Sequence, residues 1–274
     1  MKVTSLSISN FRAFSELPTT QLGQINVLIG PNNVGKSSVL RALYSLQLGA
    51  SGQFQDVRIG TKQATIQVGM EGAQDSDAWT ALRNSQGIVT LTLKPNAERT
   101  GGNQEILIAA NNTRYKVSLI PEKTPNHFID PFFSKRKAYL YAEDVRQAKA
   151  LQVSSNFQNL AAKLSMIGNP TFPSHEDYAR TGKEMLGFVV TAIPSKNGQR
   201  PGIYLADQST LFIDQLGEGV PNIVGMLADL TSSEGKLFLI EEPENDLHPG
   251  ALKALLELIL ISAECNQFVI STHS

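Results

Sequence analysis

The two ends of the chain carry apolar runs that predict β-strands. Residues 2–9 alternate between apolar and polar positions, which is typical of a strand with one buried face. The run INVLIG at 25–30 is continuously apolar and predicts a buried strand, and the runs at 236–241 and 267–271 predict two more. We expect the strand at 267–271 to be central in a parallel sheet, because such strands are apolar throughout.

Further runs in the first half of the chain predict an antiparallel sheet. Strand character is found at 64–70, 88–94, 105–110 and 114–120. The last two runs flank Asn111-Asn112-Thr113, which has the composition of a hairpin turn. Successive strands with tight connections favour antiparallel pairing over a βαβ repeat. We therefore expect a β-rich subdomain at about residues 50–125.

Helical spacing of apolar residues predicts most of the remaining elements. Helices are predicted at 36–48, 153–168, 174–187, 219–231 and 249–264, and strands at 188–193 and 202–207. The first helix is expected to bury Val39, Leu40, Ala42, Leu43 and Leu46. Ser174 and Asp177 have the spacing of a loose capping box. We expect a helical insertion at about residues 140–200.

Composition and charge narrow the class of protein. The 274 residues hold 24 Lys and Arg against 25 Asp and Glu, which argues against a polybasic nucleic-acid binder but allows a local basic cluster such as 134–137. The one cysteine, Cys265, excludes a disulfide framework within the chain and is expected to be buried. His127 and His175 are expected at the surface, and His248 at the start of a helix.

The sequence predicts neither a secretion signal nor a membrane span. The longest apolar helix, 251–263, carries Lys253 and Glu257 and is too short to cross a bilayer. We expect a soluble, cytoplasmic protein without a membrane partner. Because the chain stops at Ser274, directly after a predicted strand, we also expect the native protein to continue, with a further C-terminal region or a nuclease domain.

A phosphate-binding loop lies between the strand at 25–30 and the helix at 36–48. Residues 30–37 read GPNNVGKS and match the P-loop or Walker A motif G-x-x-x-x-G-K-[ST]. Glycines let the backbone fold around a phosphate, and loop N–H groups and the helix N-terminus attract its charge. Lys36 is expected to reach the β- and γ-phosphates, and Ser37 to bind Mg²⁺. The expected nucleotide-binding residues of the loop are Gly30, Asn32, Asn33, Val34, Gly35, Lys36, Ser37 and Ser38.

An acidic cluster ends the apolar strand in LFLIEEPENDLHP, residues 237–249. Glu241 and Glu242 are adjacent and Glu244 follows, and like charges repel unless a cation lies beside them. Mg²⁺ on a nucleotide would supply that cation. Glu241 is then expected beside Mg²⁺, and Glu242 beside the γ-phosphate as the general base that orients the attacking water.

Four motifs together are similar to those of a known class of ATPase. The segments ISNFRAF, GPNNVGKSS, IEEPENDLHP and STHS resemble the ABC-type ATPases of the RecF and structural-maintenance-of-chromosomes (SMC) class. Within that class, the resemblance favours the ATPase domain of the overcoming-lysogenization-defect (OLD) nucleases and related anti-phage ATPases. It implies an α/β P-loop ABC-type ATPase head over 1–274, with an antiparallel β-subdomain and an inserted helical lobe. Residues 50–200 carry little family signal.

The resemblance also implies roles for particular residues. Arg12 of the N-F-R segment would lie close to the nucleotide, and His273 would be the switch histidine that contacts the γ-phosphate. The LGEGV segment at 216–220 occupies the place of the signature motif. Through it, Gly217 and Gly219 would approach the phosphate held by a second head.

The sequence departs from the family pattern at two places. Gly217 and Glu218 replace the serine and glycine of the ordinary signature, and the acid weakens γ-phosphate contact unless it points away. Glu241 replaces an aspartate, which keeps the charge but lengthens the reach. The resemblance further implies that Asp246 lies in the segment that crosses the dimer interface, and that the segment 139–146 lies near the γ-phosphate.

The function that this resemblance implies is an ATP-hydrolysing switch. Two heads would pair around MgATP, as a homodimer or a higher homo-oligomer, and hydrolysis would separate them. The switch would control a nuclease, fused or separate, or another DNA-directed anti-phage activity, with DNA as an allowed partner. Two alternatives stay open: a DNA-repair clamp ATPase of the RecF type, and a nucleotide-binding scaffold with little hydrolysis, which Glu218 favours.

Overall fold

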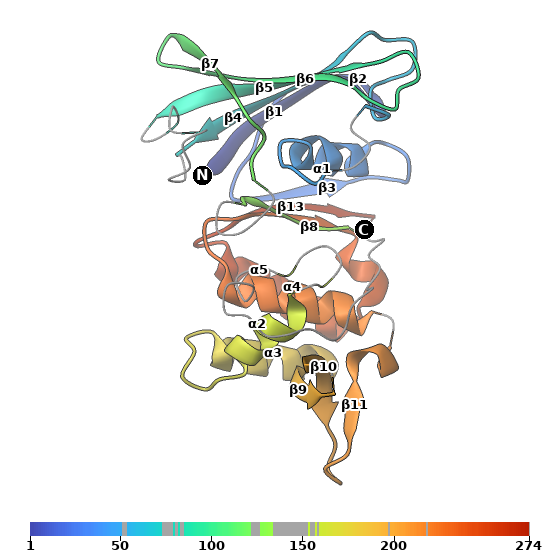
Figure 1. Ribbon diagram of the computed structural model, residues 1–274, viewed down its shortest axis with the longest axis vertical. Helices are drawn as coiled ribbons and strands as arrows, with labels where there is room; N and C mark the ends of the chain where they lie inside the picture. The colour runs from blue at the N-terminus through green and yellow to red at the C-terminus, as the bar shows by residue number, and fades with distance from the viewer. Residues whose placement is uncertain are drawn as a thin grey trace. The chain divides into compact units, whose positions relative to one another are not determined.

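The chain divides into two compact units, each described below by itself (Figure 1). The first contains residues 1–131, 235–241 and 266–274, and the second contains residues 132–234 and 242–265. The computed structural model describes residues 1–50, 54–72, 79, 82, 85–121, 127–133, 153, 157, 159–196, 198–217 and 219–273. The predictions for 134–137, 139–146 and Glu218 fall outside the described residues.

One layer of the first unit is a six-stranded antiparallel sheet in the order β2-β1-β4-β5-β6-β7 (Figure 1). Its strands are β1 (Lys2–Phe11), β2 (Phe14–Gln21), β4 (Ala64–Glu71), β5 (Gln86–Pro95), β6 (Gly102–Ala110) and β7 (Thr113–Val117). The predicted antiparallel pairing is confirmed, and the β6–β7 turn has φ of 50° at Asn111 and 60° at Asn112, as the favoured two-residue hairpins require. Strand β2 was missed, because it is largely exposed and carries few apolar residues.

The second layer of this unit is a four-stranded sheet in the order β3-β13-β12-β8. Its strands are β3 (Ile25–Ile29), β8 (Ile129–Phe132), β12 (Leu237–Glu241) and β13 (Gln267–Thr272). Strand β13 pairs in parallel with both β3 and β12, so its predicted central place is confirmed. The prediction that β3 is buried is wrong: it is an edge strand, and Val27 and Ile29 are 51% and 68% exposed.

Helix α1 (Lys36–Tyr44) lies between the two sheets and contacts β1, β12 and β13 (Figure 1). The apolar residues predicted to face inward are all buried: Val39, Leu40, Ala42, Leu43 and Leu46. The helix ends four residues earlier than predicted. The chain after it instead forms an isolated bridge between Gln47 and Ile120.

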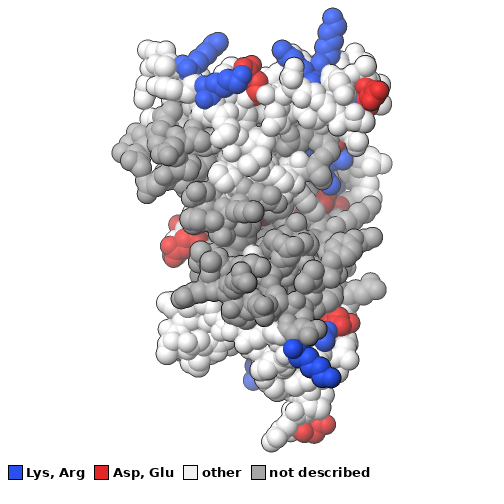
Figure 2. Space-filling view, viewed as in Figure 1, with Lys and Arg blue, Asp and Glu red and all other residues white. Residues whose placement is uncertain are grey.

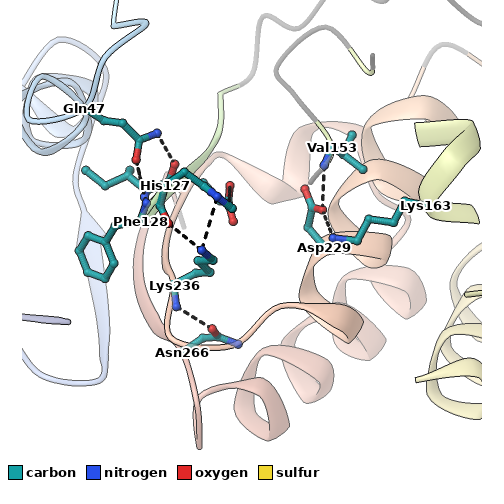
Figure 3. A network of polar contacts seen from close by, with 10 residues as sticks. Gln47, His127, Phe128, Val153, Lys163, Asp229, Lys236 and Asn266 are labelled. Atoms are coloured by element: carbon teal, nitrogen blue, oxygen red, sulfur yellow. Dashed lines mark hydrogen bonds and ion pairs between the residues drawn. The ribbon is translucent and has the colours of Figure 1, made fainter. Parts of the chain in front are cut away.

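Two buried glutamine side chains join separate parts of the first unit. The Val3 N–H donates to Gln267 Oε1 at 2.8 Å, and Gln267 Nε2 donates to the Val3 carbonyl at 2.6 Å, which ties β13 to β1. Gln47 Oε1 accepts from the N–H groups of Phe128 and Ile129, and its Nε2 donates to the Ile129 carbonyl (Figure 3). Each side-chain amide therefore forms the hydrogen bonds that a neighbouring strand would otherwise make with these buried backbone groups.

Two side chains differ in burial from the sequence prediction. His127 is buried, not at the surface: its Nε2 lies 3.5 Å from Asp130 Oδ1, and Lys236 Nζ donates to its carbonyl (Figure 3). The segment that holds it leads directly into β8 in the core. Cys265 is exposed rather than buried, because it lies in the turn after helix α5 (Pro249–Ser262).

The second unit combines helices with a small sheet (Figure 1). Its helices are α2 (Leu160–Ile167), α3 (His175–Leu186), α4 (Val220–Ser232) and α5, and its antiparallel sheet has the order β11-β10-β9, from β9 (Thr191–Ser195), β10 (Gly198–Tyr204) and β11 (Thr210–Phe212). Helix α3 packs on α4 and α5. A buried ion pair joins α2 to α4, with Lys163 Nζ 2.8 Å from Asp229 Oδ1 (Figure 3).

The helix starts of the second unit are only partly as predicted. Ser174 makes no side-chain cap hydrogen bond, so the capping box is wrong; its ψ of 3° is far from the extended backbone that a capping hydroxyl needs. His248 does begin α5, and its side chain accepts from the Gly250 N–H. None of the helices in the described part of the chain is long and apolar enough to cross a membrane.

Candidate nucleotide-binding site

The loop from β3 to α1 has a backbone that depends on glycine. Gly35 has φ of 107°, and a Cβ there would lie 2.7 Å from Phe14 Cζ on the β1–β2 hairpin. Asn33 is also left-handed, with φ of 66°. Asn32, Asn33 and Val34 are exposed, so this part of the loop is open to a ligand. The predicted strand–loop–helix arrangement is therefore present.

The ammonium group of Lys36 lies inside this loop. Its Nζ donates to the carbonyl of Gly30 at 2.6 Å and to that of Pro31 at 3.0 Å. His273 Nδ1 is 3.3 Å from the same Nζ. The structure thus brings together Lys36, Gly30 and His273, which the sequence predicted as members of one site although 237 positions separate Lys36 from His273.

The carboxyl ends of three parallel strands meet beside the loop. Glu241 on β12 is in register with Ser271 on β13, and Thr272 is in register with Ile29, the last residue of β3. Gln267, four residues before Ser271, bonds to β1 and therefore points to the face that α1 covers. Ser271 and its register neighbour Glu241 point to that same face. Helix α1 begins at the edge of this face with Lys36 and Ser37.

Ser271, which sequence reasoning did not single out, lies near the end of β13, two residues before His273. Its side chain is fully buried, and its hydroxyl has no hydrogen-bond partner among the residues that the structure describes. A buried hydroxyl without a partner is costly, and it occurs here at the end of β13 where the site begins. The signal in the sequence was a single polar residue at the end of the apolar run QFVIS.

Glu242, the predicted general base, has a strained backbone. Its φ of 50° is left-handed and turns the chain from β12 into the short helix η4 (Pro243–Asp246). Its Oε2 accepts a hydrogen bond from Asn245 Nδ2 at 2.7 Å. Non-glycine residues in this conformation cost about 1–3 kcal/mol and cluster at functional sites.

Arg12 lies on the turn of the β1–β2 hairpin. Its Nε is 3.0 Å from Asp56 Oδ1, and its N–H donates to the Asp56 carbonyl. Burial raises the pKa of the Asp56 carboxyl, while the charges of Arg12 and Arg41 oppose that rise. Phe14 on the same hairpin packs on Gly35, so Arg12 belongs to an element that touches the phosphate-binding loop.

The predicted signature segment lies in the second unit, directly before α4. Gly217 is exposed and Gly219 precedes the first residue of the helix. The short helix η3 (Ile213–Gln215) leads into this segment. Arg200 holds that turn: its guanidinium lies 2.8 Å from Asp214 and 3.9 Å from the centroid of the Phe212 ring. Asp246 falls within η4, and its side chain is outside the described residues.

These residues fit a nucleotide with Mg²⁺. Gly35 leaves a space that a Cβ would fill, and Lys36 supplies a cation to the same loop. For Mg²⁺, which prefers oxygen ligands and keeps several waters, the chain offers the Ser37 hydroxyl and the Glu241 carboxylate. These oxygen donors are of the kind expected for Mg²⁺ that is also bound by phosphate oxygens.

Comparisons with known proteins find similarity at both ends of the chain. Two family models match: "AAA ATPase domain" over residues 1–56, and "AAA domain, putative AbiEii toxin, Type IV TA system" over residues 207–274. The RecF proteins of Idiomarina loihiensis and Clostridioides difficile are 41% and 37% identical over 51 residues, and an uncharacterised protein of Methanocaldococcus jannaschii is 49% identical over 41 residues. These matches cover 19%, 19% and 15% of this chain, but only 14%, 14% and 19% of those proteins.

Solved structures with a similar fold include SMC heads. The SMC head domain from Thermotoga maritima has a TM-score of 0.53 at 13% identity, covering 100% of this chain and 90% of that one. An SMC head bound to the C-terminal winged-helix domain of ScpA has a TM-score of 0.64 at 14% identity, with the same coverage. The chain therefore has the α/β fold of a P-loop ABC-type ATPase head. In fold and in these short stretches of sequence, the chain is similar to SMC heads and to RecF proteins.

Proposed function

We propose that this chain is an ATP-binding and ATP-hydrolysing switch that pairs with a second copy around MgATP. The observation that carries the proposal is the convergence of Lys36, Gly30, His273 and Glu241 on the edge where β3, β12 and β13 end. These residues come from three separated segments of sequence.

In the proposed mechanism, the loop N–H groups and Lys36 hold the phosphates, and Ser37 and Glu241 hold the metal ion. When bound, Mg²⁺ would supply positive charge that neutralises the phosphates during the reaction. Glu242 orients a water and takes its proton as the water oxygen bonds to the γ-phosphorus. The bond from that phosphorus to the bridging oxygen breaks, and ADP keeps the electron pair. His273 and Lys36 stabilise the charge on the γ-phosphate oxygens.

We further propose that the switch controls a nuclease or another DNA-directed defence activity, as in OLD-like ATPases. The description of the family matched at 207–274 names a toxin of a toxin–antitoxin system, which supports a defence role. A RecF-type repair clamp is the second candidate, and the matches to two RecF proteins favour it. Both candidates use the same ATPase cycle, so they differ in the partner and not in the site.

DNA is a proposed partner in either case. Lysine and arginine side chains gather over the six-stranded sheet, with acidic side chains among them (Figure 2). Lys94, Arg114 and Lys116 are exposed on β5 and β7, and Lys116 is paired with Glu105 at 3.2 Å. A mixed surface of this kind is expected to bind DNA weakly and with a strong dependence on salt.

The Glu242→Gln substitution tests the proposed function. It removes the base but keeps the shape and the hydrogen-bond capacity toward Asn245, so ATP binding should persist while turnover falls by at least about 100-fold. The trapped ATP should also shift the protein from monomer to dimer in light scattering after size-exclusion chromatography. Parent-like turnover would show that Glu242 is not the base. A monomer with bound ATP would contradict the pairing.

A further inference from the structure

Ser271 combines three properties that no other described serine shares: full burial, an unpartnered hydroxyl and a place at the end of a site strand. Its exposed fraction is 0%, and its Oγ has no hydrogen-bond partner within the described part of the chain. Buried polar groups in folded proteins are almost always bonded, to protein or to ordered water. A group that breaks this rule at the edge of a binding site points to a partner that arrives with the ligand.

The position of Ser271 identifies the kind of partner. It is the register neighbour of Glu241 on the adjacent parallel strand, so the two Cα atoms are about 4.8 Å apart. Both side chains point to the face that α1 covers, and α1 begins with Lys36 and Ser37. Glu241 is the carboxylate proposed to hold Mg²⁺. Ser271 and the proposed metal ligand Glu241 are therefore neighbours on one face of the sheet, at the end where the helix with Ser37 begins.

We propose that Ser271 is a positioning residue for the metal ion, and that its hydroxyl binds a water of the Mg²⁺ hydration shell which Glu241 also orients. Mg²⁺ gives up its waters reluctantly, so a protein site commonly holds it through them. Residues that orient a metal's ligands in this way typically contribute 10–100-fold to metal affinity. The inference rests on the proposed function, because it assumes that a metal–nucleotide complex binds at this edge.

A role in metal binding can be distinguished from a structural role, because the two predict opposite effects on stability when the Ser271 hydroxyl is removed. Ser271→Ala removes a buried polar group without a partner, so the nucleotide-free protein should keep its urea midpoint or gain stability. Ser45 is the matched control in the same unit. It is equally buried, but its hydroxyl donates to the Arg41 carbonyl at 2.8 Å. Ser45→Ala should therefore lower the urea midpoint and leave metal binding unchanged.

The metal arm of the experiment uses Mn²⁺ as the probe, titrated in the presence of a non-hydrolysable ATP analogue and followed by electron paramagnetic resonance. We expect Ser271→Ala and the isosteric Ser271→Cys to bind Mn²⁺ about tenfold more weakly than the parent, and Ser45→Ala to bind it like the parent. Equal Mn²⁺ affinity in the parent and both Ser271 variants would overturn the proposal. A urea midpoint lowered as much in Ser271→Ala as in Ser45→Ala would also overturn it, since the hydroxyl would then be bonded in the nucleotide-free protein.

The same titration distinguishes failure of this inference from failure of the proposed function. If the parent binds neither the analogue nor Mn²⁺ with the analogue, the nucleotide site itself is wrong and the Ser271 role fails with it. If the parent binds both and the Ser271 variants bind Mn²⁺ as tightly as the parent does, the nucleotide site stands and the Ser271 role alone is wrong.

Discussion

Arg12 is held in an unfavourable backbone conformation by one partner. Its φ is 48°, and its N–H and its guanidinium both bond to Asp56. The pair fixes the turn of the hairpin whose next aromatic residue, Phe14, packs on Gly35. Arg12 thus has a measurable structural role, whatever contact it makes with a nucleotide.

We predict that Arg12→Ala raises the pKa of Asp56 further. Burial already raises it above the ordinary value of 3.8, and Arg12 is the larger of two opposing charges. When the pKa of a carboxyl is higher in the folded than in the unfolded protein, the fold loses stability as the pH rises from the ordinary pKa to the raised one. Arg12→Ala should therefore destabilise the fold more at pH 7 than at pH 3. Carboxyl-detected NMR titration checks the pKa, with the neighbouring Arg58→Ala as a control that should leave Asp56 unchanged.

Among the elements, the phosphate-binding loop and the β1–β2 hairpin are coupled through Gly35. Gly35→Ala would force alanine to adopt the existing φ of 107° and would place its Cβ 2.7 Å from the Phe14 ring. The free energy of unfolding should therefore fall by about 2–4 kcal/mol. Gly60→Ala is the matched control. It has φ of 84° with open space around it, and should cost about 1 kcal/mol. Urea denaturation measures both, and the addition of Phe14→Leu should recover the part due to the clash.

Helices α2 and α4 are joined by the buried pair Lys163–Asp229, and Asp229 Oδ1 also accepts a hydrogen bond from the Val153 N–H (Figure 3). Lys163→Met leaves a buried carboxylate without its cation and should lower the free energy of unfolding by about 3–5 kcal/mol. Changing Asp229→Leu as well should restore much of that loss. The exposed pair Arg180–Asp177 is the control, and its loss should cost less than about 1 kcal/mol. A Lys163→Met variant as stable as the parent would contradict this account.

The elements that the sequence predicted well are those whose signal is local. The phosphate-binding loop needs only eight consecutive residues, and the β6–β7 hairpin needs only its two asparagines. Burial of β3 could not be read from its apolar run, because its edge position depends on β13, more than 230 residues away. For the same reason sequence reasoning did not single out Ser271: its proposed role depends on its register with Glu241, which exists only after the sheet forms.

For the whole molecule, the proposed site uses two copies of the chain. The phosphate-binding loop and Glu241 lie in the first unit, and the signature segment around Gly219 lies in the second. In the proposed dimer, each nucleotide meets the loop of one copy and the signature segment of the other. If the site is shared between copies, two differently inactivated chains should regain activity when they are mixed. A site within one copy would not allow this recovery.

We predict that Lys36→Ala and Gly219→Asp chains are each inactive alone and regain ATPase activity when mixed. Lys36→Ala removes the cation of the loop. Gly219→Asp places a negative charge toward the phosphates, and the backbone at Gly219, with φ of −74° and ψ of −22°, is one that any L-residue adopts, so the fold should be kept. Each mixed dimer has one site with an intact loop and an intact signature, so random pairing should give about a quarter of the parent turnover per chain. Mixing Lys36→Ala with Glu242→Gln is the control: loop and base come from one copy, so both sites stay defective. Absence of recovery in the first mixture, with dimers formed, would show that the site does not cross between copies.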